Sequence, residues 1–274
     1  MSDYQHPQDD ALFVLNEVIG FDQLCNTIGA EECNSELAAI VLNEAGKLGS
    51  QLLAPLNSIG DKNPPKLESN GVQETAGYKE AYTQFVDGGW NGLTSKEEYM
   101  GQNLPNVLGT AVNEIWQSAN LAFALCPLLN QGAVAAVTEH ASEELKAEFL
   151  EKMVSGEWTG TMNLTEPDAG SDLAAIRSTA TPMGDHYLVK GQKIFITWGD
   201  HQMTDNIVHL VLARLPDAPA GVKGISLFLV PKYLKDETGN YTQRNDAHAI
   251  ALEHKLGIHS SPTCVMSFGD QGGA

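Results

Sequence analysis

A hydroxyl-rich loop at the centre of the chain, Trp158–Asp172, carries the residue types best suited to binding chemistry. Thr165 and Ser171 offer hydroxyl groups, and Gly170 lets the main chain approach a ligand closely. Consecutive backbone N–H groups in such a loop can form a nest that holds an anion. These residues favour a site for a pyrophosphate or for the electron-rich edge of a flavin. Hydroxyl-rich loops are common, however, and from the residues alone a polar turn between two strands without a ligand is the favoured interpretation.

Three motifs, taken in order along the chain, decide between these interpretations. They are Leu164–Pro167 with Gly170–Asp172, then Gly191–Thr197, then Leu256 and Gly257 with Ser260–Thr263. This series resembles the flavin-contacting motifs of the acyl-CoA dehydrogenase family, and three ordered motifs are more specific than any one alone. Gly101–Pro105 and the helix around Ala119 and Asn120 also fit the family. The resemblance therefore covers most of the chain.

The resemblance implies FAD as cofactor and assigns roles to individual residues. Leu164 and Thr165 meet the flavin ring, and the Thr165 hydroxyl and amide lie near its pyrimidine edge. Phe195 packs on the ring, Thr197 donates to the nitrogen that receives hydride, and Ser171 contacts the pyrophosphate and the acyl-CoA substrate. The implied cofactor-binding residues are Met162, Leu164, Thr165, Gly170, Ser171, Phe195, Ile196 and Thr197.

Within the family, the chain is most similar to the 3-methylmercaptopropionyl-CoA dehydrogenase-like branch. This likeness rests on Asp205–Pro216, Gly224–Lys232, Glu253–Gly257 and Cys264–Met266, and the helical N-terminal extension fits that branch too. Met162 stands where the family often has an aromatic residue, and Phe195 where it often has tryptophan. The sequence therefore does not decide which acyl group the substrate carries, and 3-methylthiopropanoyl-CoA is one candidate substrate.

The implied reaction is oxidation of an acyl-CoA thioester to the trans-2-enoyl-CoA. A glutamate removes the α-proton while the β-hydride passes to the flavin. The family places that glutamate in a C-terminal four-helix domain, which we expect to lie beyond residue 274. No catalytic residue is therefore expected in this chain, and Glu139 and Glu148 are interpreted as solvated helix residues. We expect the chain alone to bind FAD weakly and not to turn over.

The rhythm of apolar residues changes near Trp158 and predicts an α+β fold. An all-helical N-terminal domain is expected before it and an antiparallel β-barrel or sandwich middle domain after it. The predicted units are an N-terminal helical extension (1–40), a helical domain (41–157) and a β-rich domain that binds FAD and acyl-CoA (158–274). The predicted strands are 187–190, 193–197, 207–212, 225–230 and 263–268.

Local signals locate the ends of several helices. Ser35 is expected to cap a helix that runs to Leu53, with Pro55 just beyond its end and a loop over residues 57–74. Helices are expected over 106–124 and again over 133–140. Ser142 is expected to open the next helix, and Gly156 to end it.

Composition limits the classes of partner. The formal net charge is −19, from 16 Lys and Arg against 35 Asp and Glu, which argues against nucleic acid and anionic membranes as partners. No secretory signal or transmembrane stretch is recognised, so a cytoplasmic protein is expected. The four cysteines have no C-x-x-C spacing, and no metal site is expected. The histidines of the β-rich part are interpreted as surface or packing residues: His201, His209, His248, His254 and His259.

Alternatives to the dehydrogenase remain open at the level of sequence. An acyl-CoA oxidase differs by letting oxygen reach the reduced flavin. A non-enzymatic DNA-binding relative of the alkylation response needs a basic surface, which the acidic composition disfavours. A stand-alone FAD or CoA carrier is the fourth possibility. The family further implies electron-transfer flavoprotein as electron acceptor and a homo-oligomeric full-length form.

Overall fold

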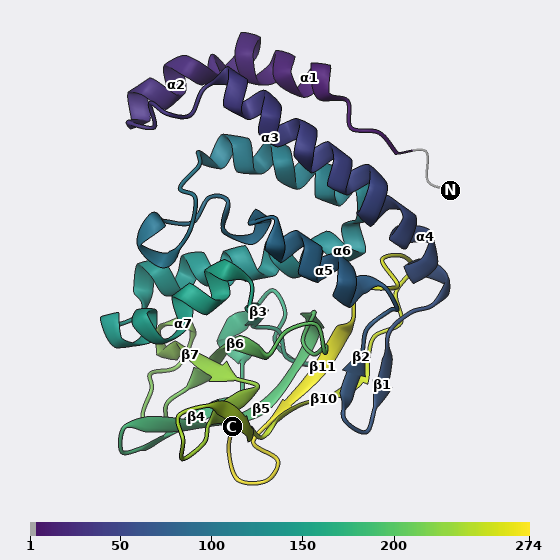
Figure 1. The fold of residues 1–274 in the computed structure, drawn as a ribbon. Helices are drawn as coiled ribbons and strands as arrows, with labels where there is room; N and C mark the ends of the chain where they lie inside the picture. The colour runs from purple at the N-terminus through teal and green to yellow at the C-terminus, as the bar shows by residue number, and fades with distance from the viewer. Residues whose placement is uncertain (1–3) are drawn as a thin grey trace.

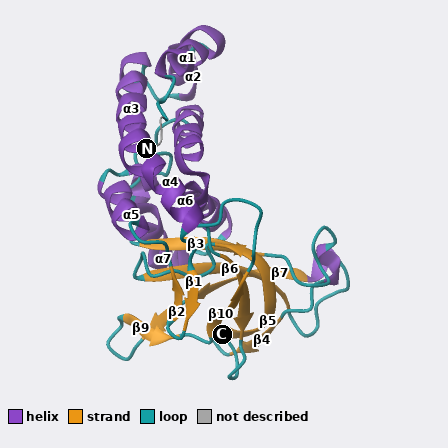
Figure 2. Ribbon diagram, turned by 90° about the vertical axis from the view of Figure 1, so that its right-hand side faces the viewer, coloured by secondary structure: helices purple, strands orange, loops and turns teal. Residues whose placement is uncertain are grey.

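The chain folds into a stack of helices above a curved, β-rich unit (Figures 1 and 2). This computed structural model describes residues 4–274. The last helix of the upper part ends at Ser155 and the first strand of the large sheet begins at Trp158. Helices therefore give way to strands at the position where the sequence rhythm changes. The helical elements before that point are α1 (Gln8–Phe13), η1 (Val14–Ile19), α2 (Phe21–Ile28), α3 (Ser35–Leu48), η2 (Gly49–Leu53), α4 (Ala54–Lys62), α5 (Tyr78–Asp87), η3 (Trp90–Gly92), η4 (Glu97–Tyr99), α6 (Asn106–His140) and α7 (Glu143–Ser155).

Three predictions near the start of the helical part were wrong. Asn34, not Ser35, caps α3, because its side chain accepts a hydrogen bond from the Leu37 N–H at 2.9 Å. Pro55 does not follow a helix end but lies near the start of α4, which continues directly from the π-helical turn η2. The predicted loop is accordingly the second half of α4 and a small hairpin of β1 (Lys66–Glu68) and β2 (Gly71–Gln73).

Helix α6 is longer than predicted and breaks at a different place. The predicted gap between two helices lies inside continuous helix, and the break is instead at Asn120, whose backbone is not helical. The Asn120 amide donates to the Leu53 carbonyl at 3.1 Å, and its oxygen accepts from the Phe123 N–H at 3.1 Å. Asn120 thus re-caps the second half of α6. The Ser142 cap and the left-handed Gly156 after α7 are confirmed.

The length and apolar character of α6 would allow it to cross a membrane. Half of its most apolar window is nevertheless buried inside the protein. Its buried side chains pack into two of the hydrophobic cores, as those of a central helix do.

The β-rich part is built on a seven-stranded mixed sheet. Its strands are β3 (Trp158–Asn163), β4 (Thr179–Met183), β5 (His186–Thr197), β6 (Asn206–Arg214), β7 (Ile225–Pro231), β10 (Ala247–Leu252) and β11 (Thr263–Phe268). Their order in the sheet is β10-β11-β5-β4-β6-β3, and β7 also pairs with β6. Strands β8 (Tyr233–Lys235) and β9 (Tyr241–Arg244) form a separate hairpin, and η5 (Leu173–Ala175) and η6 (Val222–Gly224) are single turns.

The purely antiparallel arrangement predicted from the sequence was wrong in one respect. Strands β3 and β6 pair in parallel, from Trp158 opposite Asn206 to Asn163 opposite Val211. The β4–β5 hairpin lies between them in sequence and forms part of the crossover, which gives a parallel pair the long connection that it needs. Gly184 lies in the turn that closes this hairpin, and the two predicted strands 187–190 and 193–197 form one continuous strand, β5.

The helices and the sheet share one interface. Trp198 donates its indole N–H to the Ala122 carbonyl at 3.0 Å, and the hydroxyls of Tyr78 and Ser260 lie 2.6 Å apart. Helix α6 also lies so close to β3 that a Cβ atom at Gly160 would come within 2.4 Å of the Ala133 methyl group. The upper and lower parts therefore form one packed body, and the sheet is held in a fixed place beneath the helices.

Candidate functional site

Hydrogen bonds join the first two motifs side by side. The Ile194 N–H donates to the Thr165 carbonyl at 2.9 Å, and Lys193 Nζ donates to the Leu164 carbonyl at 3.0 Å. The two carbonyl groups that directly follow β3, those of Leu164 and Thr165, are therefore held by neighbouring residues of β5. The structure thus brings together two segments that the sequence separates by almost thirty residues.

A β-bulge turns the second motif outward. Cys264 pairs with Ile196 and Met266 with Lys193, so two residues of β5 face one residue of β11. Phe195, one of the two, has a φ of 61° and its side chain is 58% exposed. Left-handed backbone at a bulky residue is uncommon and is concentrated at binding sites. The bulge presents an aromatic ring to the surface at the predicted position.

Three predicted hydroxyl groups have no hydrogen-bond partner in the described part of the chain. Within residues 4–274, no hydrogen bond is made by the hydroxyls of Thr165, Ser171 or Thr197. Thr165 and Thr197 are half-buried and Ser171 is exposed. Together with the exposed Phe195 ring, they form a set of donors and one apolar face. This set fits a planar heteroaromatic group with acceptor atoms at its edge and a phosphate nearby, which is the chemistry of FAD.

Other predicted residues play a different part. The Ile196 side chain is 2% exposed and lies in the core of the sheet, so only its backbone can meet a ligand. Met162 packs against the cluster between β3 and the helices. Leu164, at the end of the same strand, is half-buried. The sequence did not show which of these side chains are buried and which are exposed, and their role in cofactor binding stays a prediction.

A buried carboxylate supports the loop from behind. Glu166 accepts hydrogen bonds from the backbone N–H groups of Arg177 and Ser178, at 2.6 and 3.1 Å, and from the Ser178 hydroxyl at 2.6 Å. Burial acts to raise the pKa of Glu166, but these bonds and Lys193 together hold it below its ordinary value. Sequence reasoning assigned no part in the site to Glu166 or Lys193. The available signal was a lysine and a glutamate inside motifs otherwise rich in apolar and hydroxyl groups.

The far end of the loop is also anchored. Arg214 donates to the carbonyls of Ala174 and Ile176, at 2.6 and 3.1 Å, and to that of Gly221 at 2.9 Å. Asp172 accepts from the Ala174 N–H at 3.0 Å. Between these anchors and Glu166, residues Gly170 and Ser171 stay exposed.

The third motif connects the β-rich part to the helices. Ser260 is buried against Tyr78, and His259 Nδ1 lies 2.8 Å from a carboxylate oxygen of Asp61 in α4. Leu256, by contrast, is fully exposed. In the described residues this motif has a structural role.

Glu148 is not a freely solvated helix residue, which corrects the sequence interpretation. It accepts a hydrogen bond from the Tyr241 hydroxyl and lies 2.8 Å from Lys235 Nζ, so it ties α7 to the β8–β9 hairpin. Glu139 is exposed, as predicted.

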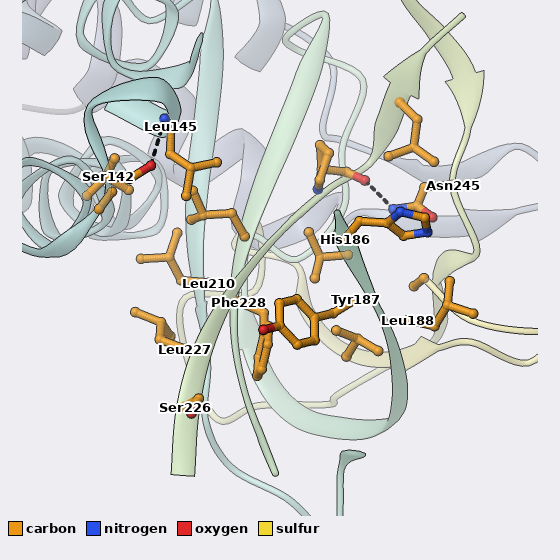
Figure 3. Close-up of a pocket in the computed structure, with 18 of the residues that line it drawn as sticks. Ser142, Leu145, His186, Tyr187, Leu188, Leu210, Ser226, Leu227, Phe228 and Asn245 are labelled. Carbon is orange, nitrogen blue, oxygen red and sulfur yellow. Dashed lines mark hydrogen bonds between the residues drawn. The ribbon is translucent and has the colours of Figure 1, made fainter. Parts of the chain in front are cut away.

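A hollow of about 800 Å³ in the described part of the chain does not coincide with the motifs (Figure 3). It lies between the C-terminal end of α6 and the start of α7 on one side and strands β5, β6 and β7 on the other. Its lining residues include Leu145, Leu210, Leu227 and Phe228. None of the predicted cofactor-binding residues lines it.

Gly170 permits a direct test of whether a ligand occupies the loop. Its φ is not left-handed, and a Cβ atom there would meet no other atom of residues 4–274 within 4 Å. The fold of the chain therefore does not require glycine. We expect Gly170→Ala to leave the urea unfolding midpoint unchanged but to weaken FAD binding about tenfold, because the methyl group takes up ligand space. Gly132→Ala, equally unobstructed but on α6, is the control; equal FAD affinities in both variants would contradict the expectation.

Comparison with known proteins decides the family. The N-terminal domain of acyl-CoA dehydrogenases matches residues 62–157, and the middle domain of the same enzymes matches residues 161–271. The chain belongs to the acyl-CoA dehydrogenase family. The 3-methylmercaptopropionyl-CoA dehydrogenase of Ruegeria pomeroyi is 47% identical over 266 residues, which are 97% of this chain and 45% of that protein. The predicted family is confirmed, and this similar relative carries the name of the predicted branch.

Solved acyl-CoA dehydrogenases share the fold. A glutaryl-coenzyme A dehydrogenase in complex with glutaryl-CoA is 25% identical, with a TM-score of 0.68, over 86% of this chain and 54% of that one. An acyl-CoA dehydrogenase of Bacillus anthracis complexed with FAD is 23% identical, with a TM-score of 0.67, over 86% of this chain and 36% of that one. The chain spans less than half the length of the Ruegeria pomeroyi relative and of two butyryl-CoA dehydrogenases of Syntrophomonas wolfei that it also matches.

Proposed function

We propose that this chain forms the FAD- and acyl-CoA-binding part of an acyl-CoA dehydrogenase. The observation that carries the proposal is the pairing of the first two motifs at the bulge of β5, with unpartnered hydroxyls at Thr165 and Thr197 beside an exposed Phe195 ring. When bound, FAD supplies the hydride-accepting group for oxidation of the Cα–Cβ bond. The chain contributes the groups that bind and orient that cofactor.

Each residue has a defined task in this proposal. Thr165 and Thr197 donate hydrogen bonds to the acceptor edge of the ring, where negative charge accumulates on reduction. Phe195 provides an apolar surface for the ring, and Gly170 and Ser171 approach the pyrophosphate and the acyl-CoA. The glutamate that removes the α-proton is expected outside this chain.

The wider expectations for the full-length protein also stay proposals. The substrate is an acyl-CoA thioester, with 3-methylthiopropanoyl-CoA suggested by the 47% identical relative. Electron-transfer flavoprotein is the proposed acceptor, and the full-length form is proposed to be a cytoplasmic homo-oligomer without nucleic-acid or membrane partners. That the curled sheet closes into a barrel or sandwich is likewise a proposal.

Removing the two hydroxyls tests the proposed cofactor site. We expect Thr165→Val and Thr197→Val each to weaken FAD binding about three- to tenfold, because each loses a ligand hydrogen bond worth about 0.5–1.5 kcal/mol. FAD affinity is measured by quenching of flavin fluorescence on titration with the purified chain.

Thr83→Val is the matched control, because Thr83 is exposed on α5 and its hydroxyl donates only to the Lys79 carbonyl. Its FAD affinity should equal that of the unaltered chain. Failure of the unaltered chain to bind FAD at all would remove the support for the proposed function.

A further inference from the structure

The ion pair of Glu166 and Lys193 lies directly behind the proposed flavin site. Lys193 Nζ is 2.8 Å from a Glu166 carboxylate oxygen, and the side chains of Lys193 and Glu166 are 0% and 7% exposed, respectively. A lysine buried to this degree is costly unless it is paired and hydrogen-bonded. Its second acceptor is the carbonyl oxygen of Leu164, at 3.0 Å.

The arrangement joins the two motifs through one ammonium group. Lys193 belongs to the second motif, whereas Leu164 and Glu166 flank Thr165 in the first. With the Leu164 carbonyl held by Lys193 and the Thr165 carbonyl held by the Ile194 N–H, the peptide groups on both sides of Thr165 are fixed. The Thr165 hydroxyl remains without a partner in residues 4–274 and is left for a ligand.

Glu166 also spans the loop. The backbone N–H groups of Arg177 and Ser178 donate to it, and backbone hydrogen bonds with Ala169, both 3.0 Å, close the turn through Pro167. One buried carboxylate therefore connects the start of the loop, its turn and the segment after η5.

We propose that Lys193 and Glu166 are positioning residues that set the orientation of Thr165 for the flavin. This inference rests on the proposed function. Burial of the pair does not by itself indicate a positioning role, because an ion pair with a purely structural role can be buried in the same way. A buried ammonium group needs a second acceptor for stability as well, and the distinguishing feature is which acceptor it has: the Leu164 carbonyl, in the peptide group that precedes Thr165.

The test separates positioning from stability. Lys193→Met leaves Glu166 buried without its cation and should lower both the urea midpoint and FAD affinity. The double variant Glu166→Gln/Lys193→Met contains no unpaired charge and should regain most of the midpoint. It still lacks the donor to Leu164, so we expect FAD binding to stay about tenfold weaker than in the unaltered chain, with a shifted flavin absorption spectrum.

A second readout needs no cofactor. Hydrogen exchange at the Ile194 amide reports whether the Thr165 carbonyl keeps its place. In the double variant we expect this amide to exchange about tenfold faster, while the Trp198 amide, bonded to Pro262, keeps its rate. If the unaltered chain failed to bind FAD, the proposed function would be lost, but the exchange rates would still decide whether Lys193 positions Thr165.

The matched control is a second buried ion pair of the described residues, Asp200 and Lys232, which lies just outside the strands and whose charged atoms are 2.7 Å apart. Asp200→Asn/Lys232→Met should change neither FAD affinity nor Ile194 exchange. The proposal is overturned if the Glu166→Gln/Lys193→Met variant regains FAD affinity together with stability, or if Ile194 exchange is unchanged in it.

Discussion

The free energy of unfolding is expected to fall by up to about 5 kcal/mol as the pH drops from 6.5 to about 3, owing to His209 alone. His209 is buried in the sheet, where its Nδ1 and the Thr161 hydroxyl lie 2.7 Å apart. Burial, and then the positive charges of Arg244 and Lys232, lower the pKa of His209 to about 3.

The loss of stability at low pH follows from the protons that the folded and unfolded chains bind. An unfolded chain protonates this histidine near pH 6.5, whereas the folded chain keeps it neutral until about pH 3. The full contribution is therefore present above pH 6.5 and is lost progressively as the pH falls through the range between the two values. His201, which is hydrogen-bonded to Thr159 at 3.0 Å and whose pKa burial also lowers, acts in the same direction.

Urea unfolding of the chain at a series of pH values between 7.5 and 5 checks this expectation. His209→Gln keeps a polar group opposite Thr161 but cannot be protonated, so its stability should decline less steeply with falling pH. His186→Gln changes an exposed histidine and should reproduce the slope of the unaltered chain. Parallel stability curves for His209→Gln and the unaltered chain would show that His209 is not the acid-sensitive group.

Gly160→Ala is expected to lower the free energy of unfolding by about 1–3 kcal/mol, although it adds a single methyl group. A Cβ atom at Gly160 would lie 2.4 Å from the Ala133 methyl group and 2.8 Å from the Met153 Cε atom. The Ala133 methyl is carried on the α6 backbone and cannot rotate away. Helix and strand must therefore separate, which loosens the interface between the helices and the sheet.

A compensating substitution makes this test specific. Ala133→Gly alone should cost about 1 kcal/mol, because glycine is a poor helix residue, but it frees the space that the new methyl group needs. In that background Gly160→Ala should be much less harmful, giving a favourable coupling energy in a double-mutant cycle. Gly132→Ala, at the neighbouring open position, should be neutral or stabilising. Additive effects of the Gly160 and Ala133 substitutions would exclude direct contact as the cause.

The sequence by itself determined the family, the change from helices to strands at Trp158 and the two segments of the proposed site. These features are local: apolar periodicity specifies helix or strand, and short motifs carry their own turn and hydroxyl residues. Strand β11 illustrates this, since its predicted range of 263–268 agrees with the structure. The caps at Ser142 and Gly156 are local in the same sense.

Only the tertiary structure decided how these pieces meet. The break of α6 at Asn120 depends on the Leu53 carbonyl, which is distant in sequence, and the parallel pairing of β3 with β6 depends on the crossover between them. The same holds at the site. The buried Lys193 and the exposed Phe195 are two residues apart on one strand, and a bulge against β11 directs one inward and the other outward. Strand periodicity places residues two apart on the same face, so periodicity by itself could not have separated them.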